Sequence, residues 1–261
     1  MKKKAILSVS FGTKDKDLEQ KTIGTLEKEY QEVLPNQPVY RAITNEALIK
    51  IMKHEDGVEP VYAVREVLAR MVLDEVTKVY VQPAYLLHGT EYEELKEMVF
   101  SHKADFIEVK CGEPLLSSQE DLENVAKAIM SDYEGLGEDE AVCFVGHGSE
   151  HYTNAIYCAI DYALKDQGYP NAHIATFNAY PKIDKVINHL KKTDTKKVHI
   201  APFMFVAGES AMEGVCGDAE DSMATKLRNA GFEVIPHRVC LGENPKIREI
   251  FKNHLAAIVN E

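Results

Sequence analysis

The sequence has no tryptophan, only five cysteines and fewer basic than acidic side chains. Its 261 residues include 30 Lys and Arg against 42 Asp and Glu, which gives a formal charge of -12. Because a nucleic-acid binder needs a basic face to neutralise phosphates, this charge argues against that class. No apolar run approaches the roughly 20 residues that span a bilayer, and the first apolar stretch is too short for a secretory signal. We therefore expect a cytoplasmic globular protein without a membrane or nucleic-acid partner.

Motifs of several common enzyme classes are also missing. GxSxG, the nucleophile elbow of α/β-hydrolases, does not occur. GxGxxG and the phosphate-binding loop GxxxxGKS/T are absent as well, so the usual dinucleotide and nucleotide sites are not indicated. The cysteines, at positions 111, 143, 158, 216 and 240, are odd in number and form no CxxC pair. They predict small core residues rather than a disulfide framework or a zinc knuckle.

The sequence does contain an alternation of short apolar segments and longer amphipathic ones. Strands are predicted at 4–12, 38–44, 78–87 and 105–112, with helices at 13–34, 58–76 and 91–102 between them. Apolar strands separated by helices are typical of a parallel sheet that is covered on both faces. The same order then begins again, which predicts a second α/β half.

Four pairs of segments support this repeat. They are AILSVSFGT (5–13) with AVCFVGHGS (141–149), YRAITN (40–45) with HIATFN (173–178), KVYVQPAYLLHGTE (78–91) with KVHIAPFMFVAGES (197–210), and VKCGEP (109–114) with VCLGENP (239–245). Four matches in the same order indicate two similar α/β halves. We predict halves at 1–115 and 141–261, joined by a connecting helix and turn at 116–140.

Ligands of open parallel sheets bind beyond the carboxyl ends of the strands, so we expect the two halves to face each other across a cleft. The candidate site residues are those predicted at the strand ends. They are Ser10, Phe11, Gly12, Thr13, Tyr85, His88 and Glu91 in the first half, and Gly146, His147, Gly148, Tyr180, Gly208 and Glu209 in the second. His147 aligns with Phe11, and His88 aligns with Ala207. Each half therefore contributes one histidine, from a different strand.

Each candidate also has a structural interpretation. The glycines beside His147 let a ligand approach, and imidazole is a common metal ligand, but the same glycines suit a plain turn. Glu91 and Glu209 begin segments where the helix dipole favours acids. The segment 208–214 is predicted as a loop. The remaining helical or linking histidines are expected at the surface, at positions 54, 102, 189, 237 and 254.

Several segments together resemble the anaerobic sirohydrochlorin cobaltochelatases of the CbiK type, a class II chelatase family. They are VSFGT (9–13), GHGSEH (146–151), AIYCAIDYAL (155–164), AYPKID (179–184), PFMFVAGES (202–210), Gly217-Asp218 and GENPKIREIF (242–251). The resemblance covers the whole chain and implies two Rossmann-like halves. It also implies a lyase of cobalamin biosynthesis that inserts Co(II) into the tetrapyrrole sirohydrochlorin without ATP or an organic cofactor, with Fe(II) or Ni(II) as alternative metals. His147 would bind the metal and take protons from the pyrrole nitrogens.

Two positions depart from the family pattern. The loop after VAG carries Asp-His in the family and Glu209-Ser210 here, and a family glutamate before Tyr180 is replaced by Asn178. One hypothesis is a rebuilt metal site of His147, His88 and one of Glu91 or Glu209. In this hypothesis His147 and Glu91 are catalytic, and the other strand-end residues bind the macrocycle. Another is a carrier or sensor that binds a tetrapyrrole or metal without inserting it. A small-molecule binding protein of the periplasmic type shares the architecture but not the motifs, and a homo-oligomer stays open.

Overall fold

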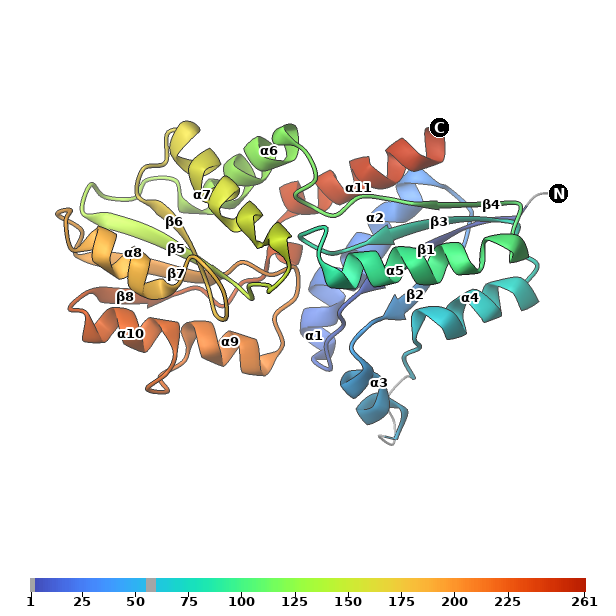
Figure 1. Cartoon of the computed structure of the whole chain (residues 1–261), viewed down its shortest axis with the longest axis horizontal. Helices are drawn as coiled ribbons and strands as arrows, with labels where there is room; N and C mark the ends of the chain where they lie inside the picture. Colours follow the sequence, from blue (N-terminus) through green and yellow to red (C-terminus); the bar gives the residue numbers. More distant parts are fainter. Residues whose placement is uncertain (1–2, 55–59) are drawn as a thin grey trace. The chain divides into compact units, whose positions relative to one another are not determined.

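The computed structural model describes residues 3–54 and 60–261, which form two compact units (Figure 1). One unit comprises Met1–Leu115 together with Arg248–Glu261, and the other comprises Leu116–Ile247. Each unit contains a four-stranded parallel sheet, with the orders β2-β1-β3-β4 and β6-β5-β7-β8. The predicted α/β fold of two Rossmann-like halves is confirmed. The C-terminal helix, however, groups with the first unit, whereas the sequence placed it in a second half at 141–261.

The first unit follows the predicted alternation of strands and helices. Its strands are β1 (Lys4–Ser10), β2 (Val39–Ile43), β3 (Lys78–Pro83) and β4 (Glu108–Cys111). Its helices are α1 (Lys16–Glu19), α2 (Thr25–Val33), α3 (Glu46–Lys53), α4 (Val64–Leu73) and α5 (Thr90–Ser101). The C-terminal helix, α11 (Pro245–Asn260), belongs to this unit from residue 248 onward. A π-helical turn at Gln20–Gly24 joins α1 to α2. The helix predicted at 58–76 begins at Val64, and its residues 58 and 59 lie outside the described residues.

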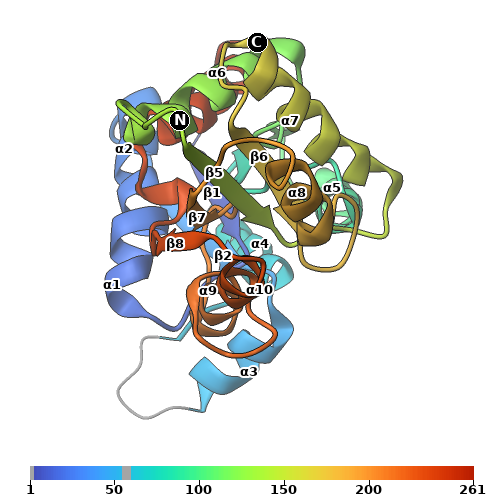
Figure 2. The ribbon, with the colours of Figure 1, turned by 90° about the vertical axis from the view of Figure 1, so that its left-hand side faces the viewer.

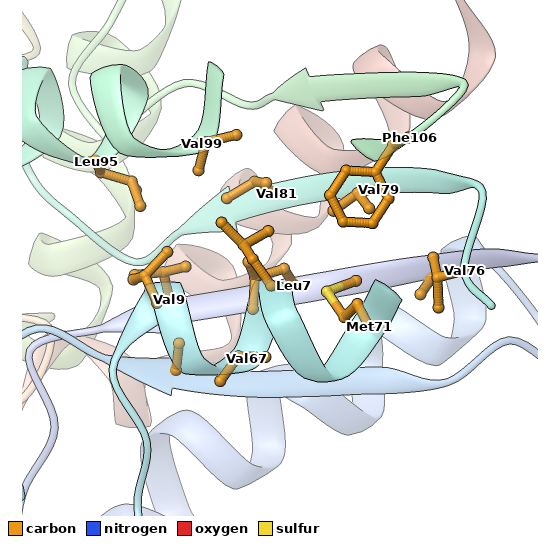
Figure 3. Packing of buried hydrophobic residues seen from close by; sticks show 14 residues of the cluster. Leu7, Val9, Val67, Met71, Val76, Val79, Val81, Leu95, Val99 and Phe106 are labelled. Atoms are coloured by element: carbon orange, nitrogen blue, oxygen red, sulfur yellow. The ribbon is translucent and has the colours of Figure 1, made fainter. Parts of the chain in front are cut away.

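Helices α4 and α5 bury one face of the first sheet. Alternate residues of β1 and β3, among them Leu7 and Val81, point into a cluster with Met71 of α4 and Val99 of α5 (Figure 3). These side chains are fully buried. Because the strands are parallel and their connections are helical, all carboxyl ends lie at one edge of the sheet, where the candidate residues sit.

The second unit repeats this plan. Its strands are β5 (Glu140–Gly146), β6 (Ala172–Thr176), β7 (Lys197–Pro202) and β8 (Glu233–Pro236). Its helices are α6 (Gln119–Met130), α7 (Ile156–Asp166), α8 (Ile183–Leu190), α9 (Glu209–Cys216) and α10 (Met223–Asn229). Helices α6 and α7 lie on one face of the sheet, and α9 and α10 on the other (Figures 1 and 2). The prediction of a loop at 208–214 was wrong, because α9 begins at Glu209.

The strand registers test the predicted repeat residue by residue. Ala5 pairs with Val79 in the first sheet, and Ala141 pairs with Val198 in the second, as the alignment requires. The fourth pair of segments was aligned wrongly. Val109 of β4 corresponds to Val234 of β8, because Lys78 pairs with Glu108 and Lys197 pairs with Glu233. The segment 239–245 follows the last strand, contains a 3-10 turn at Leu241–Glu243 and ends at the first residue of α11.

The structure also bears on two other predictions, the burial of the cysteines and the lack of a membrane-spanning segment. Three cysteines, Cys143, Cys216 and Cys240, are buried as predicted and Cys111 is half-buried, but Cys158 is exposed on α7. Within residues 3–54 and 60–261, no helix combines the length and the apolar character that a membrane crossing requires.

Candidate functional site

His147 directly follows β5, one of the two inner strands of the second sheet. A Cβ at Gly146 would lie 2.3 Å from Cε1 of Tyr157, so the packing of α7 on the strand end leaves room only for glycine. Gly148 has a φ of +82°, in the left-handed region that favours glycine. The turn thus requires both glycines, and His147 between them is exposed. The two glycines are therefore needed for the turn itself, and the same turn leaves the His147 side chain open to a ligand.

Polar contacts hold the loop that follows His147. The amide of Ser149 donates to Oδ1 of Asn154 at 3.0 Å, and Nδ2 of Asn154 donates to the carbonyl oxygen of Tyr180 at 2.6 Å. His151 caps the next turn, with its Nδ1 2.9 Å from Oγ1 of Thr153. Asn154 therefore ties the His147 loop to the loop after β6, a role that the sequence did not reveal because the two segments are 26 residues apart.

The sheet order places three candidate positions at neighbouring strand ends. β5 lies between β6 and β7, so His147 stands between Asn178, which follows β6, and the loop from β7 to Glu209. The amide of Asn178 donates to the carbonyl oxygen of His147 at 3.3 Å. Asn178, Gly208, Glu209 and Ser210 are exposed, as is Tyr180, at 59%. The second unit thus presents a histidine, an aromatic ring and polar side chains at one edge.

In the first unit, the end of β1 presents a single large side chain. Phe11 is 53% exposed, whereas Ser10, Gly12 and Thr13 are buried. The carbonyl oxygen of Ser10 accepts the amide of Thr44 at 3.0 Å, and Oγ1 of Thr13 accepts the amide of Asp15 at 3.2 Å. These buried residues shape the turn around Phe11, and their predicted part in substrate binding stays a prediction.

Tyr85 connects the ends of β3 and β2. Its hydroxyl donates to Oγ1 of Thr44 at 3.2 Å. Burial raises the pKa of Tyr85 well above its ordinary value, so its hydroxyl stays protonated throughout the physiological range. Tyr85 is thus a neutral, half-buried side chain at the carboxyl edge of the first sheet.

His88 and Glu91 lie on the same connection from β3 to α5 but in different surroundings. Nε2 of His88 is 3.0 Å from Oε2 of Glu113, and its ring contacts Tyr92 edge to face with centroids 4.8 Å apart. The hydroxyl of Tyr92 donates to the carbonyl oxygen of Gly112 at 3.2 Å. Glu91, in the first turn of α5, is exposed. Glu113 can therefore orient the His88 ring, as carboxylates do for metal-bound histidines.

The predicted metal residues belong to both units, His88 and Glu91 to the first and His147 and Glu209 to the second. Within the described ranges, no three His, Cys, Asp or Glu side chains gather in the arrangement of a closed metal site. The chemistry available at each edge is that of imidazole and carboxylate groups that solvent can reach.

A family model described as cobalt chelatase (CbiK) matches residues 4–260. The chain belongs to the cobalt chelatase family. It is 32% identical over 261 residues to a sirohydrochlorin cobaltochelatase of Salmonella typhimurium, covering 99% of this chain and 97% of that protein. It is 29% identical over 263 residues to the sirohydrochlorin cobaltochelatase CbiKC of Nitratidesulfovibrio vulgaris, covering 100% of this chain and 92% of the relative. The predicted family is confirmed, and the carrier, sensor and periplasmic hypotheses gain no support.

Solved chelatases share the fold of this cobalt chelatase family member. SirB from Bacillus subtilis with Fe3+ superposes with a TM-score of 0.68 at 17% identity, over 99% of this chain and 97% of that one. The sirohydrochlorin chelatase SirB from Bacillus subtilis subspecies spizizenii, in complex with cobalt, gives a TM-score of 0.64 at 17% identity over 97% and 94%. At these identities the likeness establishes the chelatase fold alone.

Proposed function

We propose that this chelatase inserts Co(II) into sirohydrochlorin in cobalamin biosynthesis, with His147 as the central catalytic residue. The observation that supports this role is the exposed imidazole of His147 at a rigid, glycine-flanked strand end. The full-length similarity to sirohydrochlorin cobaltochelatases supports the substrate.

The reaction requires modest chemistry from the protein. A divalent metal replaces the two hydrogens on the pyrrole nitrogens, so two protons must leave as the metal enters. A neutral imidazole can accept such a proton and return it to solvent. In our proposal His147 takes these protons in turn and contacts the incoming metal, and Glu91 relays protons or binds the metal.

The remaining strand-end residues suit the flat macrocycle. Phe11 and Tyr180 are large rings that solvent reaches, and such rings can stack on a conjugated ligand. We assign them to the macrocycle, together with Ser10, Gly12, Thr13, Tyr85, Gly146, Gly148 and Gly208. His88 and Glu209 are assigned with His147 and Glu91 to the metal.

Co(II) is the metal that we propose, and Fe(II) and Ni(II) are the alternatives, because these ions share ligand preferences. The metal is a substrate in this reaction. We expect no requirement for ATP or an organic cofactor, and we expect the enzyme to act in the cytoplasm.

Anaerobic absorption spectroscopy tests this function. Purified protein is mixed with sirohydrochlorin and Co(II), and the spectrum of the metal-free macrocycle is followed into that of the cobalt complex. We expect acceleration over a protein-free reaction, and we expect His147→Ala to remove it while leaving the far-UV circular dichroism unchanged. An uncatalysed rate with the parent protein would contradict the proposal, and an unaffected rate in His147→Ala would contradict the role of His147.

A further inference from the structure

A pair of histidines lies in the second unit, one within a strand and the other directly after the carboxyl end of the neighbouring strand. His199 belongs to β7, and His237 directly follows β8 (Figure 1). In the register of these strands His199 pairs with Ile235, and the amide of His237 donates to the carbonyl oxygen of Ile200 at 2.8 Å. The ladder therefore brings Nδ1 of His199 to 2.8 Å from Nε2 of His237. One of these nitrogens carries a hydrogen, and the other offers a lone pair.

Glu140 favours one arrangement of this hydrogen. Its Oε2 lies 3.4 Å from Nε2 of His199, and its Oε1 is held by Nζ of Lys197 at 2.9 Å. The contact between Glu140 and His199 is not a hydrogen bond, and Nε2 of His199 has no hydrogen-bond partner among the described residues. The negative charge of the carboxylate nevertheless favours the ring hydrogen on that nitrogen. The lone pair of His199 is then on Nδ1, where it faces His237.

The pair lies in a sheltered environment beside the ion pair of Glu140 and Lys197. The side chain of His199 is 13% exposed, and the ring of Tyr133 contacts both imidazoles edge to face, with centroid distances of 6.0 and 5.1 Å. Burial, and then the neighbouring His199, lower the pKa of His237 below its ordinary value. His237 is therefore neutral at pH 7, the form in which imidazole binds metals. The expectation that His237 is a surface residue was wrong, because it is half-buried in this pair.

We propose that His199 and His237 form a second metal site, which takes a borderline divalent transition ion such as Zn(II) or Ni(II). Imidazole nitrogens suit these ions. Two nitrogens that share an ion at about 2.0–2.1 Å lie about 2.8–3.4 Å apart. The pair therefore has to open by a few tenths of an ångström, and both rings have to turn so that their lone pairs converge on the ion rather than along the line that joins the two nitrogens. Glu140 is a positioning residue that orients His199, and water completes the coordination. The ring hydrogen of His237 moves to its Nδ1, so binding needs no net release of a proton.

This site is distinct from the one proposed for cobalt insertion. His199 pairs with Val142 of β5, and His147 lies five residues further along that strand and its extension. At about 3.3 Å per residue, the two positions are about 16 Å apart along the strand. The proposal therefore holds or fails independently of the chelatase reaction.

Zinc binding to the full chain tests the proposal. The measurement is equilibrium dialysis with Zn(II) at pH 7.5 on a His147→Ala background, so that the substrate metal site does not compete. We expect a bound zinc ion that is lost in His199→Gln and in His237→Gln and retained in His54→Gln, an exposed histidine that serves as the control. Glu140→Gln is expected to weaken zinc binding by about 10–100-fold. Equal zinc binding by the parent, His199→Gln and His237→Gln proteins would overturn the proposal.

A second measurement needs no substitution in the pair and so avoids any loss of folding. Long-range 1H–15N spectra of the histidine rings are recorded while Zn(II) is added to the His147→Ala protein. We expect the largest shifts at Nδ1 of His199 and Nε2 of His237. Shifts confined to other histidines would overturn the proposal, whatever the outcome of the chelatase assay.

Discussion

The amide of Asn178 donates to the carbonyl oxygen of His147 at 3.3 Å. This hydrogen bond joins the two loops that directly follow β6 and β5, next to the last paired residues, Gly146 and Thr176. A residue at 178 is therefore a neighbour of the proposed catalytic histidine. In the resemblance to the cobaltochelatases, this position carries a glutamate, and position 210 carries a histidine.

We predict that Asn178→Glu with Ser210→His increases the affinity for Co(II) and the rate of insertion. Both residues are exposed, so the longer side chains can be accommodated without repacking. An added carboxylate and imidazole supply ligand types that divalent cobalt accepts. The matched control is Asn178→Gln with Ser210→Asn, which adds bulk without charge or imidazole. Equal rates in the restored and the control proteins would show that these positions do not contact the metal.

We predict that His88→Ala weakens Co(II) binding severely. His88 is oriented by Glu113 at 3.0 Å and is a candidate ligand of the substrate metal. Glu113→Gln keeps the shape of the side chain but loses the charge, and it should weaken binding by about 10–100-fold, as loss of such an orienting group does elsewhere. Calorimetric titration with Co(II) gives both affinities. An unchanged affinity in His88→Ala would show that His88 does not bind the metal and only contacts Glu113 and Tyr92.

The sequence predicted the features of the fold that depend on local pattern and repetition. Ala5 and Ala141 occupy equivalent strand positions, and so do Val79 and Val198. The two sheets have the same strand order, so the same positions of each strand are buried and carry apolar residues. The fourth strand was misaligned because β8, EVIP, is only partly buried and carries a weaker apolar signal than the segment after it. Features that depend on contacts across the sheet could not be predicted. The His199–His237 pair forms only through the register of β7 with β8, and no spacing in the sequence encodes it.

We predict that Gly146→Ala destabilises the fold even though it adds only a methyl group. The new Cβ would meet the Tyr157 ring at 2.3 Å, and such overpacking costs about 1–3 kcal/mol in unfolding free energy. Gly208→Ala is the matched control, since its φ is -64° and a Cβ there meets no described atom within 4 Å. Urea denaturation compares the two variants. If Tyr157→Leu is then added to Gly146→Ala, the cost should shrink, and additive effects of the two substitutions would contradict the contact.

We predict that unfolding free energy falls on acidification because of His173. This residue of β6 is 5% exposed, and burial, followed by the charge of Lys165, lowers its pKa to about 4. Between the ordinary value of 6.5 and about 4, the unfolded chain binds a proton at His173 that the folded chain does not. Stability therefore decreases as the pH falls through this window, by up to about 1.4 kcal/mol per pH unit.

His173→Gln removes the group that binds this proton, so the unfolding free energy should depend less steeply on pH. Urea denaturation of the parent, His173→Gln and His54→Gln proteins at pH 7, 6 and 5 measures the difference. The carboxylates and the other histidines are common to the parent and His173→Gln proteins, and His189 is the one among them whose ring contacts His173, with centroids 5.1 Å apart. For this reason the comparison includes His173→Gln with His189→Gln. The same slope in the parent and in both His173 variants would show that His173 is charged in the folded protein, with Asp161 rather than burial deciding its protonation.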